Sequence, residues 1–258
     1  MCNLTIIIST FNERILHVEN AVKIVHPQIK YLIIHQNKAS VKVPLFLQRD
    51  DIKIINTITK GLSKSRNIGI KNCKTKYALI ADDDVEYIEE ALEKVLEIMK
   101  DDAPDFASFK VKTPNDEPEF KNYPSEKHLF KNSYIPVASI EILLNINAIK
   151  NKQIAFDERF GLGTKLRQGE EEIFIQDLIR KGFNGIFYPL FLVKHPYEST
   201  GTKPIKESKK YFLKGALSQR LGKKYKLPKF NSLIRSFKNI IFLYSGKMYI
   251  LFTKRTRL

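Results

Sequence analysis

Residues 77–84 read YALIADDD, a mostly apolar run that ends in three adjacent aspartates. The run Tyr77-Ala78-Leu79-Ile80-Ala81 has the length and composition of a buried strand. Three adjacent carboxylates repel one another unless a cation lies among them, and such oxygen ligands favour Mg²⁺ or Mn²⁺, which can in turn hold phosphates. The stretch therefore predicts a strand that delivers Asp82, Asp83 and Asp84 to a metal and phosphate site.

Helix capping is the structural alternative for these aspartates. Glu86 follows Asp83 by three residues, a variant of the capping-box spacing, and residues 86–100 have the apolar stripe of an amphipathic helix. Capping needs one aspartate and not three. We therefore expect Asp83 to cap this helix from within the site, and Asp82 and Asp84 to serve the site alone.

Short apolar runs alternate with helical patterns on both sides of this stretch. Further strands are expected at 4–9, 31–34, 52–56, 137–142, 185–188 and 191–194. Helices are expected at 18–25, 62–73, 86–100, 169–181, 206–221 and 231–243. This alternation predicts an α/β fold, a mostly parallel sheet with helices on both faces, and such sheets bind ligands at the carboxyl ends of their strands.

The composition is that of a globular protein with a core of its own. The chain has 258 residues, 43% of them apolar, and its two cysteines are Cys2 and Cys73. So few cysteines argue against a disulfide framework and for a reducing cytosol. The amino-terminal run lacks a basic segment before it, so we expect no signal peptide. The longest candidate for a membrane span, 240–252, is too short.

Basic charge is concentrated at the carboxyl-terminal end of the chain. Residues 203–258 hold 16 of the 44 basic residues and only one of the 28 acidic residues, Glu207. This asymmetry predicts a surface that meets anionic lipid, nucleic acid or an acidic substrate. The alternative, a lysine-rich chain with replaceable surface positions, does not explain why the excess is confined to one end.

Three further segments carry polar groups at expected element ends. Gly169-Glu170-Glu171-Glu172 begins a helix, where acids either stabilise the helix dipole or act as a general base. His195 ends an apolar strand, where it is either structural or a metal or phosphate contact. Residues 9–14 (STFNER) and 62–67 (LSKSRN) offer groups that suit phosphate or base contacts, although the former could also cap a helix.

In this order the segments resemble the family 2 glycosyltransferases of the GT-A fold. The matching pieces span roughly residues 4–201 and read IISTFNE (7–13), GLSKSRNIG (61–69), DDD (82–84), GEE (169–171) and His195. Each piece is weak alone, and their order makes the match specific at the level of the family. The resemblance implies an inverting transfer of a hexose-type sugar from a nucleotide-diphosphate sugar, with a UDP-sugar as the expected donor, in cell-surface polysaccharide synthesis.

The resemblance also implies roles for individual residues. The implied donor-binding residues are Thr10, Phe11, Glu13, Asn37, Arg66, Asp82 and Asp83. The implied acceptor-binding residues are Gly163 and Glu170, and the implied ligands of Mn²⁺ or Mg²⁺ are Asp84 and His195. Glu171 takes the place of the catalytic base. Relatives often carry an aspartate where this chain has His35-Gln36-Asn37, which leaves Asn37 as the candidate for a base contact.

The resemblance divides the chain into three parts. Residues 1–202 are the expected GT-A catalytic domain, with a nucleotide-sugar-binding half at 1–112 and an acceptor-binding half at 113–202, and residues 203–258 form a basic helical tail. We expect a glycan or lipid-linked acceptor and a cytoplasmic protein, peripheral at the inner face of an anionic membrane through that tail. A sugar-phosphate nucleotidyltransferase and a nucleic-acid-binding protein are the rival readings, and we expect no nucleic-acid partner.

Overall fold

The computed structural model describes residues 3–132, 134–198, 206–222 and 233–254. Within these residues, nine strands form one curved sheet. Eight strands follow the order β3-β2-β1-β4-β8-β6-β9-β5, and β7 pairs with β9. The strands are β1 (Leu4–Phe11), β2 (Ile29–Gln36), β3 (Ile52–Thr57), β4 (Tyr77–Asp82), β5 (Glu86–Tyr87), β6 (Phe106–Lys112), β7 (His128–Leu129), β8 (Ile142–Asn145) and β9 (Gly185–Lys194). Neighbours from β3 to β4 are parallel, as are β6 and β9, while β8 runs against both β4 and β6.

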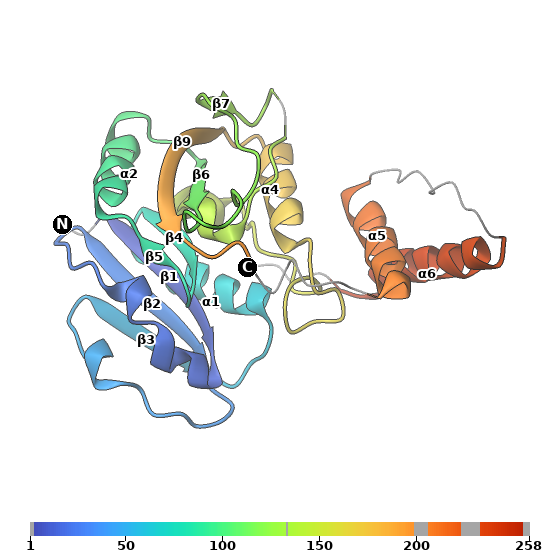
Figure 1. The fold of residues 1–258 in the computed structure, drawn as a ribbon, viewed down its shortest axis with the longest axis horizontal. Coiled ribbons are helices and arrows are strands. Elements are labelled where there is room, and N and C mark those ends of the chain that lie inside the picture. Colours follow the sequence, from blue (N-terminus) through green and yellow to red (C-terminus); the bar gives the residue numbers. More distant parts are fainter. Residues whose placement is uncertain (1–2, 133, 199–205, 223–232, 255–258) are drawn as a thin grey trace.

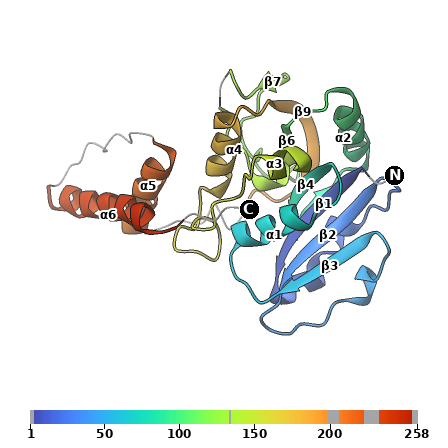
Figure 2. The same ribbon diagram turned by 180° about the vertical axis from the view of Figure 1, so that it is seen from behind.

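Helices cover both faces of this sheet, as Figures 1 and 2 show from opposite sides. The α-helices are α1 (Leu62–Asn72), α2 (Glu89–Asp101), α3 (Ile146–Asn151), α4 (Glu170–Arg180), α5 (Glu207–Leu221) and α6 (Leu233–Phe252). Side chains that alternate along β1 enter two separate apolar clusters: Ile6 and Ile8 pack with α2, and Ile7 packs with α1, α3 and α4. The predicted α/β class with a mostly parallel sheet is confirmed.

Several expected elements differ from those observed. Residues 18–25 do not form an α-helix, and the segment after β1 consists of short 3₁₀ turns, η1 (Asn12–His17) and η2 (Asn20–Val22). The strand expected at 137–142 begins only at Ile142, after the 3₁₀ turn η4 (Ser139–Glu141). The remaining 3₁₀ turn of the described residues is η3 (Leu45–Leu47). The two strands expected at 185–194 are one strand, β9, and β6 and α3 were not expected at all.

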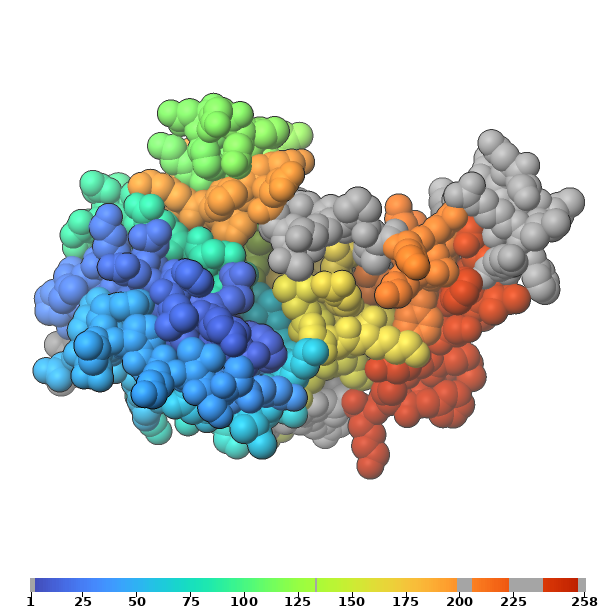
Figure 3. All heavy atoms as spheres, turned by 60° about the horizontal axis from the view of Figure 1, so that its bottom comes forward, coloured from blue at the N-terminus to red at the C-terminus, as the bar shows by residue number. Residues whose placement is uncertain are grey.

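The carboxyl-terminal helices form a hairpin that projects from one side of the sheet (Figure 1). Figure 3 shows this hairpin against the segment around residues 150–175. The contact is partly apolar, since Leu217 and Leu221 of α5 and Ile250 of α6 share a buried cluster with Phe160 and Ile173. No helix among the described residues is long and apolar enough to cross a membrane.

Ion pairs also hold the hairpin against the sheet domain, the part of the fold from β1 to β9. The guanidinium of Arg220 on α5 lies 2.7 Å from a carboxylate oxygen of the fully buried Asp157 and also pairs with Asp177. Arg159 pairs with Asp157 at 2.6 Å and donates a hydrogen bond to the carbonyl of Ile250 on α6. The predicted boundary at residues 202 and 203 lies outside the described residues, as does Cys2, while Cys73 is a buried free thiol.

Candidate active site

A pocket of about 780 Å³ lies at the carboxyl ends of the central strands, between the start of α1 and the start of α4. This volume is in the range of small-molecule sites. Ten of the twelve residues predicted for the site line it: Thr10, Phe11, Arg66, Asp82, Asp83, Asp84, Gly163, Glu170, Glu171 and His195. They come from segments up to 185 residues apart in the sequence, and parallel strands bring them to one edge of the sheet.

Glu13 and Asn37 do not line this pocket. The Asn37 amide holds its own loop, because its Nδ2 donates to the carbonyl of Val41 at 2.9 Å and its Oδ1 accepts from the amide of Val41 at 2.8 Å. Both polar ends of the side chain are engaged in this way. A contact of Glu13 or Asn37 with the donor therefore stays a prediction.

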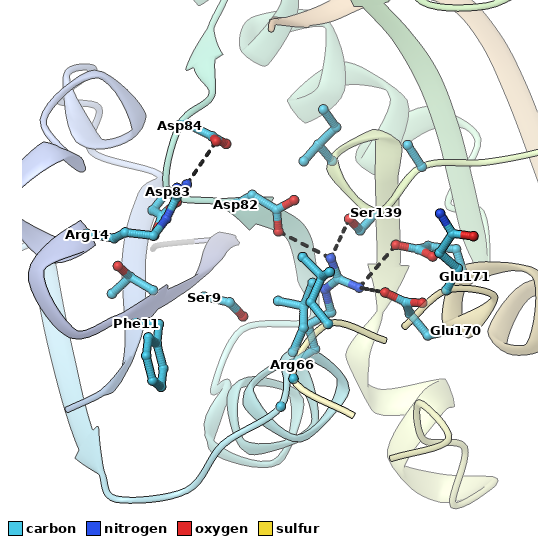
Figure 4. Close-up of a pocket in the computed structure, with 18 of the residues that line it drawn as sticks. Ser9, Phe11, Arg14, Arg66, Asp82, Asp83, Asp84, Ser139, Glu170 and Glu171 are labelled. Carbon is cyan, nitrogen blue, oxygen red and sulfur yellow. Dashed lines mark hydrogen bonds and ion pairs between the residues drawn. The ribbon is translucent and has the colours of Figure 1, made fainter. Parts of the chain in front are cut away.

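The three aspartates at the end of β4 point in different directions (Figure 4). Asp82 pairs with Arg66 at 3.2 Å, the buried Asp83 pairs with Arg14, and the half-exposed Asp84 faces both Arg14 and His195. The expectation that Asp83 caps a helix is wrong. Residues Glu86–Tyr87 form β5, and α2 begins only at Glu89, where its capping position Ile88 makes no side-chain cap.

Arg14 is a site residue that the sequence did not single out. Its Nη2 lies 2.9 Å from Asp84 Oδ2, and its Nε donates to Asp83 Oδ1 at 2.8 Å. The hydrogen bond from His195, together with Arg14, lowers the pKa of Asp84 to about 2 despite partial burial. Asp84 is therefore an anion throughout the physiological pH range. The 3₁₀ turn η1 after β1 places Arg14 here. The sequence predicted a helix at 18–25 and did not predict this turn.

His195 presents one ring nitrogen to this side of the pocket. Its Nε2 lies 3.5 Å from Asp84 Oδ1, and its ring makes a T-shaped contact with the ring of Phe120. Its Nδ1 lies 2.6 Å from the carbonyl oxygen of Pro196, a distance at which Nδ1 must carry the proton and donate it. Nε2 therefore donates to Asp84 only when His195 is protonated, and this contact raises the pKa of His195. In neutral His195 the Nε2 lone pair is available to a metal ion, as in metal-ligating histidines whose other nitrogen donates to a carbonyl.

The donor set fits a divalent cation on chemical grounds. Asp84 offers a carboxylate suited to Mn²⁺ or Mg²⁺, and His195 offers an imidazole nitrogen, which suits Mn²⁺ better than the oxygen-preferring Mg²⁺. Within the described part of the chain, no group of three or more acidic, histidine or cysteine side chains lies close enough to hold a metal by itself. Such a cation would therefore depend on further ligands from the donor phosphates and water.

Arg66 forms the floor of the pocket and links its two sides (Figure 4). The side chain is 1% exposed and its charge lies over the ring of Phe156. Its Nη2 donates to Ser139 Oγ at 2.6 Å and to Asp82 at 3.2 Å, and its Nη1 lies 3.2 Å from Glu171. Burial by itself lowers the pKa of Arg66, but the surrounding carboxylates outweigh burial and raise it. Arg66 is therefore a permanent cation.

Glu170 and Glu171 open α4 opposite the aspartates. Glu171 is partly exposed, lines the pocket and hydrogen-bonds to Arg66. Glu170 is buried 3.6 Å from Arg66, and no described group hydrogen-bonds to its Oε2. Burial, and then the neighbouring Glu171 carboxylate, raise the pKa of Glu170 to about 8. At neutral pH the pair thus combines a protonated acid in the wall with a more exposed carboxyl group beside Arg66.

The sequence also matches a protein-family model. Residues 5–165 match the model described as glycosyl transferase family 2. The chain belongs to this family. The match covers β1 from Thr5 onward, the three aspartates and Arg66, and it stops five residues before Glu170. Family membership makes the chain a glycosyltransferase, and it confirms the resemblance drawn from the sequence motifs.

Solved structures with a similar fold include the glycosyltransferase TarS of S. aureus. One TarS structure aligns over 94% of this chain and 43% of its own chain, with a TM-score of 0.59 and 15% identity. Residues 1–349 of TarS in complex with UDP-GlcNAc align over 97% of this chain and 73% of theirs, with a TM-score of 0.62 and 15% identity. This chain therefore spans less than half of the longer TarS chain and shares the GT-A fold. A search of curated proteins finds no match.

Proposed function

We propose that the chain transfers a hexose-type sugar from a UDP-sugar to a glycan or lipid-linked acceptor with inversion at the anomeric carbon. The observation that carries this proposal is the convergence of Asp84 and His195 on one wall of the pocket and Glu171 on the other, with Arg66 between them. The TarS fragment of similar fold binds UDP-GlcNAc, which supports a uridine nucleotide as the donor carrier.

Residues at the β1 and β4 ends would bind the donor. Thr10, Phe11 and Asp82 line this end of the pocket, and Arg14 is the cation nearest to Asp83 and Asp84. When Mn²⁺ or Mg²⁺ is bound by Asp84 and His195, it supplies positive charge that stabilises the departing diphosphate. Residues 1–112 would then act as the donor half and residues 113–202 as the acceptor half.

Glu171 would accept the proton of the attacking hydroxyl. As that proton moves to the Glu171 carboxylate, the hydroxyl oxygen bonds to the anomeric carbon and the bond from that carbon to the diphosphate oxygen breaks. Arg66 holds the Glu171 carboxylate in place, because its Nη1 donates a hydrogen bond to Glu171 Oε1 at 3.2 Å. Glu170, protonated beside it, can donate a hydrogen bond from its Oε2 to the acceptor without competing for the proton.

Donor hydrolysis tests the proposal. Nucleotide sugars with different bases and sugars are incubated with the purified protein and Mn²⁺, Mg²⁺ or a chelator, and the released nucleoside diphosphate is measured. We expect slow hydrolysis of one UDP-sugar that the chelator abolishes. Hydrolysis of a different nucleotide class would overturn the uridine assignment, and full activity in chelator would overturn the role of the metal.

The rival readings make different predictions for the same pocket. A nucleotidyltransferase would release pyrophosphate from a nucleoside triphosphate and a sugar phosphate, so a pyrophosphate assay with these two substrates separates it from sugar transfer. A nucleic-acid-binding protein would bind polynucleotide without any metal-dependent diphosphate binding. The convergence of carboxyl groups in the pocket favours transfer chemistry, since such groups can hold a cation and accept a proton, which binding to nucleic acid does not require.

A further inference from the structure

Helix α6 has apolar residues on opposite faces, and one of these faces packs on α5. Its buried stripe contains Leu243, Gly246 and Ile250, at the spacing of one helix face. The packing is close, because a Cβ placed on Gly246 would lie 1.9 Å from the carbonyl oxygen of Phe212. A Cβ on Gly215 would lie 1.8 Å from the carbonyl oxygen of Leu243 on α6. Neither glycine can therefore be replaced without moving the two helices apart. This face is fully used inside the hairpin.

The opposite face of α6 is exposed and is apolar as well. Its large exposed residues are Ile241, Tyr244, Met248, Leu251 and Phe252. Their spacing of three, four, three and one places them within about half of the helix circumference. Leu251 is 59% exposed and Phe252 80%. A surface helix of a globular protein normally turns a polar face to water, so this stripe is a candidate for contact with a further apolar phase.

Charge decides which partner fits this stripe. Residues 203–258 contain 16 basic residues and one acidic residue, and α5 presents exposed Lys209 and Lys210 in the same hairpin. A second copy of the hairpin would bring the same positive charge against it and would be repelled. An anionic lipid surface attracts the lysines and accepts the apolar side chains at its boundary with the acyl chains.

We propose that the exposed face of α6 docks the enzyme on an anionic membrane, with α6 lying in the plane of the lipid headgroups. The helix is not a span, in agreement with its length and its charges. Leu217 of α5 packs against Gly169, the residue before Glu170, so the docked hairpin is directly attached to the start of α4. Docking would hold the acceptor side of the pocket near the membrane, and this consequence rests on the proposed lipid-linked acceptor.

A single tryptophan can report the insertion of this face. The chain has no tryptophan, so Met248→Trp gives a fluorescence signal from α6 alone. With vesicles of phosphatidylcholine containing about 30% phosphatidylglycerol, we expect a blue shift of emission and quenching by brominated lipid. Pure phosphatidylcholine should give neither. The matched control is Leu45→Trp, at an 80% exposed apolar position on the sheet domain, which should show no shift.

Cosedimentation with the same vesicles then measures what the stripe contributes. The triple substitution Met248→Ser, Leu251→Ser and Phe252→Ser should weaken binding about tenfold or more, because it removes the apolar contact. Val25→Ser, at a 72% exposed position on the sheet domain, should bind like the parent protein. Equal binding of the triple variant, or an unshifted Met248→Trp spectrum, would overturn the proposal.

Two further readouts separate this proposal from its alternatives. Light scattering that shows a dimer of the parent protein and a monomer of the triple variant would assign the face to self-association and overturn membrane docking. Donor hydrolysis in the absence of vesicles should be the same in the triple variant and the parent protein. If the triple variant loses vesicle binding but keeps donor hydrolysis, docking is supported. If the parent protein hydrolyses no donor at all, the proposed function is contradicted and the docking result is unaffected.

Discussion

Two buried arginine clusters in this enzyme use the same types of side chain for different ends. Arg220 and Arg159 meet Asp157 and Asp177 where the hairpin joins the sheet domain, and the Arg220 and Arg159 contacts with Asp157 are 2.7 Å or shorter. Around Arg66, one guanidinium faces the described carboxyl groups of Asp82, Glu170 and Glu171 at 3.2 to 3.6 Å. The first cluster is closely paired, and the second has an excess of acid.

Buried polar atoms without a hydrogen-bond partner also distinguish the Arg66 cluster from the Arg220 cluster. Among the described side chains, Arg66 Nε and Glu170 Oε2 are buried without a hydrogen-bond partner, whereas no such atom is found on Arg220, Arg159 or Asp157. Buried polar groups without partners are rare and costly. Both atoms belong to residues that line the pocket, where a bound ligand can complete the arrangement. The Arg220 cluster therefore joins parts of the fold, and the Arg66 cluster is prepared for chemistry.

The largest expected effect is on catalysis at Glu171. Glu171→Gln keeps the shape and the contact with Arg66 but cannot accept a proton, so we expect kcat to fall about 10³-fold, within the range of general bases. Donor binding should be unchanged by isothermal titration with UDP. Glu172→Gln, at a position that does not line the pocket, is the matched control and should keep its activity. Full transfer by Glu171→Gln would remove the assignment.

The next largest effect is on stability at Arg220. Arg220→Gln removes the cation that pairs with the buried Asp157 and with Asp177. Breaking a buried ion pair of this kind lowers the free energy of unfolding by about 3 kcal/mol. Urea denaturation measures this loss. The KM for the donor should not change in the protein that remains folded, because Arg220 does not line the pocket. A changed KM with unchanged stability would reverse the distinction between the two clusters.

A third effect is the pH dependence of stability at Glu170. Its pKa is about 8 in the folded protein and 4.5 in an unconstrained chain, so the folded state keeps a proton that the unfolded state has released. Stability is therefore lost as the pH rises from 4.5 to 8, by at most about 1.4 kcal/mol per pH unit. Glu170→Gln should flatten this part of the curve in unfolding experiments. Parallel curves for the variant and the parent protein would contradict the pKa shift.

The smallest expected effect concerns Arg14 and the metal. Arg14 is a half-exposed cation 2.9 Å from Asp84, and its removal should strengthen Mn²⁺ binding only severalfold, as expected for an exposed charge pair. Electron paramagnetic resonance of free Mn²⁺ can measure the affinity of Arg14→Ala without any turnover. Arg49→Ala, a pair with Asp51 on the sheet domain, is the control. Weaker Mn²⁺ binding by Arg14→Ala would show that Arg14 is a support of the site and not a competitor.

The local sequence predicted the elements whose pattern is complete within a few residues. An apolar run before three aspartates predicted β4 and its position at the pocket, and the helical stripes predicted α1 and α4 within one or two residues. Contacts decided the rest. The segment 18–25 has helical spacing, yet its one regular element is the 3₁₀ turn η2, which packs against β5. Strand β6 lacked a signal because it is defined by pairing with β8 and β9.

The sequence by itself determined the fold class, the family and most of the residues around the pocket, because strand and helix periodicity and short polar motifs are local properties. Only the tertiary structure decided how those residues are paired. Asp82, Asp83 and Asp84 are identical neighbours in the sequence, but Asp82 meets Arg66, Asp83 meets Arg14, and Asp84 meets both Arg14 and His195. Electrostatic roles depend on distances and burial, and the chain acquires these only when distant segments meet.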